Sequence, residues 1–311
     1  MPQLPSLICP SCRGPIAAIE CIDKVRMATQ FDDCLRRCER CGIAASNAAD
    51  SQAVTYIYRD PLGNIPNESR EGALETLGQA LNVRNRESKL RRFGFSTSED
   101  AVTWVVFTYL LRSNRLLAAL RQAGLIAHET LATSPTLLLW GAPINNSARG
   151  VEIRRQLSDL CASFQEDPNS FSEPDVIVDL GEDGLMFIEV KHLSGNDLKP
   201  AVYPGWSRYG SAVRLAWRIK DVKASGCYEL ARNWCLLNSL AAGRPASLVS
   251  LGPAKLFLGT EGARLDRFIA AVGTDERSHF RKVRWSDLLG KGLGAVPDWF
   301  AQFCRSRGLM A

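Results

Sequence analysis

Two short apolar runs around a glycine-containing turn, at residues 174–195, constrain the fold more than any other stretch of this chain. The stretch reads "PDVIVDLGEDGLMFIEVKHLSG" and carries Asp175, Glu189 and Lys191 in or beside the two runs. Burying an unpaired charge is costly unless a partner or a metal compensates it. The chain therefore has to bring these three charged groups together at one place.

Strand register decides whether the three groups can meet. Side chains alternate along a strand, so Glu189 and Lys191 share one face of the second run. A three-residue loop at 182–184, with Gly184 in the left-handed conformation of a bulged hairpin, would pair Asp175 with Lys191. All three groups would then point the same way. A loop of two or four residues would send Asp175 to the opposite face.

Two carboxylates on one face repel each other unless a hard divalent cation lies between them. Mg²⁺ prefers such oxygen ligands, and Mn²⁺ is the alternative ion. We therefore predict that Asp175, Glu189 and the backbone carbonyl of Val190 bind Mg²⁺. Lys191 would compensate the carboxylates and orient or activate the attacking water.

A second pattern lies at the N-terminus, where six of the ten cysteines fall in the first 41 residues. "ICPSCRG" and "RCERCGI" are two C-x-x-C pairs with 25 residues between them, each followed by a glycine. Four thiolates at this spacing suit tetrahedral zinc and resemble a zinc ribbon or treble-clef knuckle pair. The predicted ligands are Cys9, Cys12, Cys38 and Cys41. Cys34 is an alternative ligand, and Cys21 is expected to be a buried thiol.

A closed site of four cysteines has no open coordination position, so we expect the zinc to stabilise the fold and not to perform chemistry. The module, residues 1–60 with a closing strand in "QAVTYIY", would hold a small surface against nucleic acid or protein. A helical and basic connector, 61–95, follows it. The connector's basic residues form either a solvated face or a contact with phosphates; they are Arg84, Arg86, Lys89, Arg91 and Arg92.

The best helix of the chain begins near residue 96, where Ser96 and Glu99 have the spacing of a capping box. An apolar stripe follows at helical spacing, formed by Val102, Val105, Val106, Tyr109 and Leu110. Glu99 is either only a cap at the positive end of the helix or an acid that reaches an active site.

Beyond this helix the sequence predicts a mixed sheet flanked by helices. Apolar runs predict strands at 136–140, 175–180, 185–191, 246–251 and 254–258. Helices are expected within 152–165 and 225–242, and a turn and a helix within 280–308. The order is α-β-β-β-α-β, with the helix at 152–165 as an insertion. Tyr228 and Arg232 lie four residues apart on one helix face and are candidate substrate-binding residues.

The spacing of "PD" at 174–175, thirteen residues and then "EVK" at 189–191 resembles the PD-(D/E)XK, or restriction-endonuclease-like, nuclease superfamily. The resemblance covers about residues 96 to 260. It implies an αβββαβ core and Mg²⁺-dependent hydrolysis of phosphodiester bonds. It also implies that the helix before the sheet carries an acidic residue, which Glu99 matches and which would help a second metal. The nuclease-like domain would span 96–311.

Composition agrees with a soluble globular protein. The 311 residues are 46% hydrophobic and 23% charged, and the net charge of +5 permits a polyanionic partner. No apolar run approaches the roughly 18 residues of a membrane span, and the N-terminus does not resemble a signal peptide. We therefore expect a cytoplasmic protein without a membrane partner. Only three histidines occur, none spaced for a metal site, which disfavours histidine-based chemistry.

The sequence thus predicts a Mg²⁺-dependent deoxyribonuclease, specifically an endonuclease, with restriction or phage defence as one setting. Asp175, Glu189, Lys191 and Glu99 would be its catalytic residues. RNA is an alternative substrate, and a homodimer is compatible with the sequence. The alternative function is a non-catalytic nucleic-acid-binding or adaptor protein that retains the nuclease fold.

Overall fold

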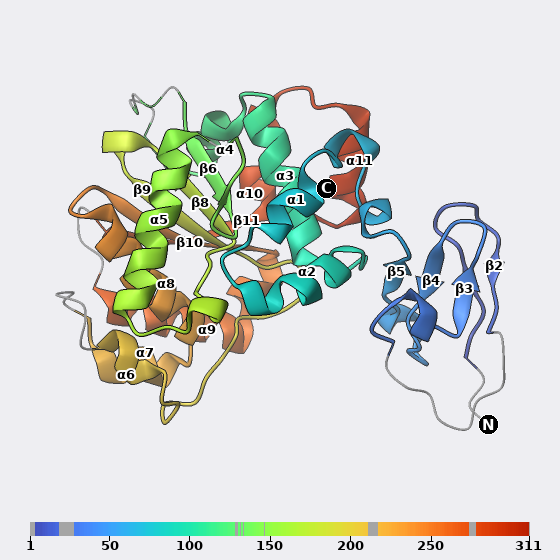
Figure 1. Ribbon diagram of the computed structural model, residues 1–311, viewed down its shortest axis with the longest axis horizontal. Coiled ribbons are helices and arrows are strands. Elements are labelled where there is room, and N and C mark those ends of the chain that lie inside the picture. Colours follow the sequence, from blue (N-terminus) through green and yellow to red (C-terminus); the bar gives the residue numbers. More distant parts are fainter. Residues whose placement is uncertain are drawn as a thin grey trace.

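A mixed six-stranded sheet with helices on both faces forms the body of the protein, and a small module of short strands lies beside it (Figure 1). The computed structural model describes residues 4–18, 28–127, 130, 132, 134–145, 147–210, 217–273 and 278–310. None of the helices in these residues combines the length and the apolar character that a membrane crossing requires.

The central sheet has the strand order β11-β10-β9-β8-β6-β7. Strands β6, β8 and β9 are antiparallel neighbours, whereas β9, β10 and β11 run parallel. The predicted mixed sheet flanked by helices is therefore confirmed. The strands are β6 (Thr136–Leu139), β7 (Ala142–Pro143), β8 (Val176–Asp179), β9 (Leu185–Val190), β10 (Ala246–Gly252) and β11 (Ser278–Arg284).

Each face of the sheet has its own apolar core because the strand side chains alternate. Val176, Val178 and Ile188 pack against α1 (Ala73–Gly78), α2 (Arg86–Phe93), α3 (Glu99–Arg112), α4 (Leu116–Gln122), α10 (Trp285–Leu288) and α11 (Asp298–Ser306). Ile177 and Phe187 pack against α5 (Ala148–Ser163), α6 (Trp206–Gly210), α7 (Ile219–Ser225), α8 (Tyr228–Ala241) and α9 (Gly259–Val272).

Helix α3 is buried along most of its length, and the predicted stripe lies in the core. Its cap differs from the prediction. The Ser98 hydroxyl, and not that of Ser96, accepts a hydrogen bond from the Ala101 N–H. The Ser96 hydroxyl instead accepts from the Tyr56 N–H of the small module. The predicted capping box of Ser96 and Glu99 is therefore wrong, because a nearer serine takes the cap position.

Two predicted elements near the C-terminus also differ. Residues 254–258, predicted as a strand, contain the 3-10 helix Ala254–Phe257 that follows Pro253. The last strand, β11, was not predicted. It pairs in parallel with β10 at the sheet edge, and Arg281, Lys282 and Arg284 on it are exposed. An edge strand with so many solvated side chains lacks the apolar run that marks a buried strand.

The β8–β9 hairpin has a longer turn than predicted. Asp179 pairs with Leu185, which places Asp175 opposite Glu189 and not opposite Lys191. The register differs from the prediction by two residues. Because side chains alternate with a period of two, Asp175, Glu189 and Lys191 still share one face of the sheet.

The conformations of the turn glycines explain this register. Gly181 adopts the left-handed conformation, with φ of 66°, at the start of a 3-10 turn over Gly181–Asp183. Gly184 has φ of 131° and ψ of −178°, so it is not the left-handed residue that the prediction required. A Cβ at Gly184 would lie 2.7 Å from the Pro245 carbonyl oxygen, so only glycine fits there.

The small module contains β1 (Leu7–Ile8), β2 (Pro15–Ile16), β3 (Arg36–Cys38), β4 (Ile43–Ala45) and β5 (Tyr56–Tyr58). Strand β5 lies within the predicted closing strand and pairs with β4. It also joins the module to the body, since Ile57 bridges to Phe95 and the Ser96 N–H donates to the Tyr56 carbonyl. Residues of the connector, Ala73, Leu77 and Phe93, lie in the same core as α3.

Asp179, at the end of β8, is a buried carboxylate paired with two arginines. Its carboxylate is 3% exposed and accepts from Arg149 Nε at 2.7 Å and from Arg244 Nη1 at 2.6 Å. Burial would raise the pKa of Asp179, but the two guanidinium groups hold that pKa below its ordinary value. The ionised carboxylate therefore stabilises the folded state.

We expect Asp179→Asn to lower the free energy of unfolding at neutral pH by about 2–3 kcal/mol, measured by urea denaturation. A depressed folded-state pKa contributes stability above the ordinary carboxylate pKa of about 4, and that contribution is lost as the pH falls. The difference from wild type should therefore shrink in acid. Asp159→Asn, an exposed carboxylate on α5 paired with Arg155 at 2.8 Å, is the control. Equal destabilisation by both variants would contradict the expectation.

Candidate functional site

The candidate site lies where β8 begins and β9 ends, on the sheet face that α8 covers. Glu189 and Lys191 are buried, with 3% and 7% of their surface exposed, and Asp175 is partly exposed. Lys191 Nζ lies 2.8 Å from Glu189 Oε1. The structure thus brings the predicted carboxylate and ammonium of β9 into direct contact and places Asp175 on the same face.

Helix α8 supplies two further polar groups that the sequence analysis did not select. Glu229 Oε2 lies 3.2 Å from Lys191 Nζ, so the lysine is shared by two carboxylates. The Asn233 side-chain amide, fully buried, donates to Glu189 Oε2 at 3.0 Å. Glu229 and Asn233 are four residues apart and face the sheet together. Helix α8 also carries other polar residues, such as Arg232 and Asn238, so the i, i+4 spacing of Glu229 and Asn233 did not single them out in the sequence.

Burial is the largest influence on the pKa values of the two carboxyl groups and the ammonium at this site. Burial raises the pKa of Asp175 to about 7, although Lys191 and Lys89 oppose the rise. Burial and the charge of Asp175 hold the pKa of Glu189 well above its usual range. Burial alone would lower the pKa of Lys191, but Glu189 and Glu229 hold that pKa well above its ordinary value. Lys191 is therefore a charged ammonium at neutral pH.

The backbone at the entrance of β8 leaves one carbonyl without its ladder partner. Val176 pairs with Ile188, and two further residues along this register place Pro174 opposite Val190. Proline has no N–H, so it cannot donate to the Val190 carbonyl. The Val190 N–H donates instead to Asp175 Oδ2 at 2.8 Å. The proline therefore frees a carbonyl oxygen beside the two carboxylates.

The donors at this site are of the oxygen type that hard divalent cations prefer. Asp175 and Glu189 offer carboxylate oxygens and Val190 offers a carbonyl oxygen, and burial, the main cause of the raised carboxyl pKa values, is a cost that a bound cation would offset. Each carboxylate has about four lone-pair positions, so the existing hydrogen bonds leave capacity for an ion. In the described parts of the chain, no three acidic side chains gather their oxygens within 4.8 Å of one another. The fit therefore depends on two carboxylates and the carbonyl.

Glu99 lies at the start of α3 and binds backbone. Its Oε1 accepts from the His192 N–H at 2.7 Å and from the Ser194 hydroxyl at 2.8 Å. His192 directly follows Lys191, and its Nε2 contacts the Arg307 carbonyl at 2.8 Å. Glu99 thus fixes the segment that follows the lysine, whereas the Lys191 ammonium contacts Glu189 of β9 and Glu229 of α8.

The two predicted substrate-binding residues of α8 lie in different environments. Tyr228 is buried in an aromatic cluster, with ring centroids 4.9 Å from Tyr203 and 5.1 Å from Trp206. Arg232 is half-buried, with Nη2 3.5 Å from Glu229 Oε1. Arg232 thus belongs to the charged group around Lys191, while Tyr228 packs in the core beside it.

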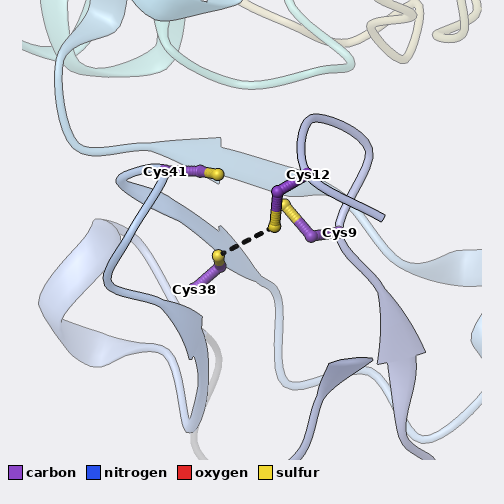
Figure 2. A group of neighbouring side chains, drawn as sticks. All are labelled: Cys9, Cys12, Cys38 and Cys41. Carbon is purple, nitrogen blue, oxygen red and sulfur yellow. Dashed lines mark hydrogen bonds between the residues drawn. The ribbon is translucent and has the colours of Figure 1, made fainter. Parts of the chain in front are cut away.

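The four predicted cysteine ligands form a second site, in the small module. Figure 2 shows Cys9 and Cys12 turned toward Cys38, at the end of β3, and Cys41, in the turn that follows it. All four sulfur atoms lie within 4.8 Å of one another, and Cys12 Sγ is 3.7 Å from Cys38 Sγ. Zinc–sulfur bonds of about 2.3 Å in a tetrahedron place sulfurs roughly 3.8 Å apart. The group can therefore hold a structural metal such as zinc.

The other predictions for the module have separate outcomes. Cys34 is buried with its thiol donating to the Gln30 carbonyl at 3.5 Å, outside the group of four, so it does not replace a ligand. Cys21 lies outside the described residues. Gly42 has a positive φ of 62° in the second knuckle, but Arg13, with φ of 60°, takes this conformation in the first.

Comparisons of the chain with protein-family models, with curated proteins and with solved structures found no match.

Proposed function

We propose that this protein is a Mg²⁺-dependent endonuclease that hydrolyses phosphodiester bonds in DNA. The observation that carries the proposal is the meeting of Asp175, Glu189 and Lys191 on one sheet face, beside a carbonyl that Pro174 leaves free. The strand and helix order around this face supports a restriction-endonuclease-like core, which the spacing of the three residues first suggested.

Each residue has a distinct task in this proposal. Asp175, Glu189 and the Val190 carbonyl would hold the metal. When bound, Mg²⁺ supplies positive charge that polarises the phosphate and lowers the pKa of a water molecule. Lys191 keeps its proton at Nζ, because its pKa is well above its ordinary value. It therefore donates a hydrogen bond to the attacking water or to a phosphate oxygen and does not act as a general base.

Asn233 and Glu229 prepare this arrangement. Asn233 fixes one oxygen of Glu189, which restricts the rotamer of the carboxylate. Glu229 gives Lys191 a second partner, so the ammonium keeps its position when a cation competes for Glu189. Burial opposes ionisation of Glu229, but Lys191 and Arg232 lower its pKa to about 2. Glu229 is thus ionised throughout the neutral range.

The experiment is conversion of supercoiled plasmid to nicked or linear DNA by purified protein with and without Mg²⁺. We expect cleavage only with Mg²⁺, and Asp175→Asn should lower the rate more than about a hundredfold, since even second-shell changes cost about 10–100-fold. Omitting Mg²⁺ is preferable to adding a chelator, because a chelator also competes for the thiolate site.

Glu182→Gln is the matched control, since Glu182 is exposed on the turn of the same hairpin. It should cut at the wild-type rate. If wild-type protein binds DNA but never cuts it with Mg²⁺ or Mn²⁺, the alternative of a non-catalytic nucleic-acid-binding or adaptor protein is favoured. A parallel assay with RNA distinguishes the two nucleic acids.

A further inference from the structure

Two arginines beside the candidate site lack an acidic partner. Arg86 on α2 donates from Nε to the Ala80 carbonyl at 2.8 Å, and Arg154 on α5 donates from Nη1 to the Gly141 carbonyl at 2.8 Å. Both side chains are half-buried. Among the described residues, neither guanidinium lies within 4.0 Å of a carboxylate, unlike most of the cations around them.

The two guanidinium groups are neighbours. Burial lowers the pKa of Arg154, and the positive charge of Arg86 lowers it further. Their anchors are also adjacent, because the Leu81 N–H donates to the Trp140 carbonyl at 3.0 Å, next to Ala80 and Gly141. Holding two like charges together in a partly buried place is unfavourable unless an anion offsets them.

The nearby Glu173 carboxylate already has two partners. Glu173 Oε1 pairs with Lys89 Nζ at 2.9 Å, and Glu173 Oε2 accepts from the Asn82 N–H at 2.8 Å. Lys89 also contacts Asp100 at 3.2 Å. Lys89 is thus one cation against two carboxylates, and Glu173 also attracts Arg154, so the two positive charges of the arginine pair are only partly offset.

The arginine pair is connected through the backbone to Asp175, one of the proposed metal ligands. The Trp140 N–H donates to the Asp175 carbonyl at 3.1 Å, so the Gly141 anchor of Arg154 is one residue from a backbone partner of Asp175. Each guanidinium carries five N–H donors in a planar fork that suits phosphate oxygens, and one of the five is used here. The pair is therefore a ready anion site at the Asp175 side of the candidate centre.

We propose that Arg86 and Arg154 form a phosphate clamp that binds a backbone phosphate of the DNA strand beside Asp175. The clamp rests on the proposed function for its ligand and assigns a role to part of the basic connector. It would fix the strand on the Asp175 side, while Lys191 faces the phosphate that reacts. The neighbouring Arg84 pairs with Asp167 at 2.6 Å and is not part of the clamp.

The test is binding of a fluorescein-labelled duplex DNA, followed by anisotropy over a range of KCl concentrations without added Mg²⁺. Arg86→Gln and Arg154→Gln should each weaken binding about tenfold at low salt. Each should also reduce the slope of log affinity against log salt by about 0.9, the value for one phosphate contact. Arg154→Lys should keep most of the slope, because it keeps the charge.

Arg155→Gln is the matched control on the next position of α5, since Arg155 is exposed and pairs with Glu152 at 2.7 Å and Asp159 at 2.8 Å. If Arg86→Gln and Arg154→Gln bind with the affinity and slope of Arg155→Gln, the clamp is wrong, even if the protein cuts DNA. If the two variants lose the contact but wild type never cuts, the clamp stands and the nuclease proposal fails. Thermal melting shows whether each variant is folded.

Discussion

Replacing Lys191 with alanine should reduce Mg²⁺-dependent DNA cleavage by about 10²–10⁴-fold, the range for loss of a group that assists proton transfer or charge development. The ammonium lies 2.8 Å from Glu189 and is the buried cation closest to the proposed ligands. Without it, the site loses the ammonium that the proposal assigns to the attacking water. The measurement is the initial rate of plasmid nicking under saturating Mg²⁺.

Loss of the fold is the competing explanation for such a result. Glu189 already has a pKa well above its usual range, so the variant can protonate this carboxyl and avoid an unpaired buried charge. We therefore expect Lys191→Ala to stay folded by circular dichroism. Lys199→Ala is the control, since Lys199 is partly exposed and pairs with Asp197 at 3.0 Å. If folded Lys191→Ala cleaved DNA at the wild-type rate, the proposed catalytic role of Lys191 would be wrong.

The sheet could be predicted from the sequence where its strands are buried. Strands β6, β8, β9 and β10 are nearly continuous apolar runs with helices on both faces, and the sequence located each of them. The edge strand β11 escaped prediction because few of its side chains are buried: Phe280 packs in the core on one face of the sheet and Val283 in the core on the other, while Arg281, Lys282 and Arg284 are exposed. Hydrogen bonding to β10 stabilises β11 although its sequence has no continuous apolar run.

Within the site, the sequence identified the residues of β8 and β9 but not their partners. The shared face of Asp175 and Glu189 follows from the period-two alternation and survives a register difference of two residues. Glu229 and Asn233 could not be selected, because a polar residue in a helix can face either solvent or the sheet. Burial decides between these, and burial depends on how α8 packs on β9 and β10.

The environments of the basic residues also could not be predicted from the sequence. The basic stretch of the connector is visible in the sequence, but its five cations have different environments. Lys89 pairs with Glu173 and Asp100, and Arg84 pairs with Asp167. Arg86 has no carboxylate partner among the described residues. Arg154 lies beside Arg86 in space, although it is 68 positions further along the chain.

Replacing Cys38 with serine should abolish metal binding by the small module. Three thiolates and a hydroxyl cannot reproduce the closed site of four sulfurs, whose apparent binding free energy for zinc is about 10–16 kcal/mol at neutral pH. Elemental analysis of purified protein should give one zinc per chain for wild type and none for Cys38→Ser. Cys34→Ser, four positions earlier and buried outside the group, should keep its zinc.

Loss of zinc from Cys38→Ser should mainly destabilise the small module. Its two small apolar cores, around Phe31 and around Ile16, are separate from those of the sheet, so the body retains its own packing without the metal. We expect proteolysis of Cys38→Ser to remove residues before β5 and leave the α/β body resistant. Unchanged zinc content in Cys38→Ser, or loss of zinc from Cys34→Ser, would contradict the assignment of ligands. Because Ile57 bridges to Phe95, digestion should stop near that junction.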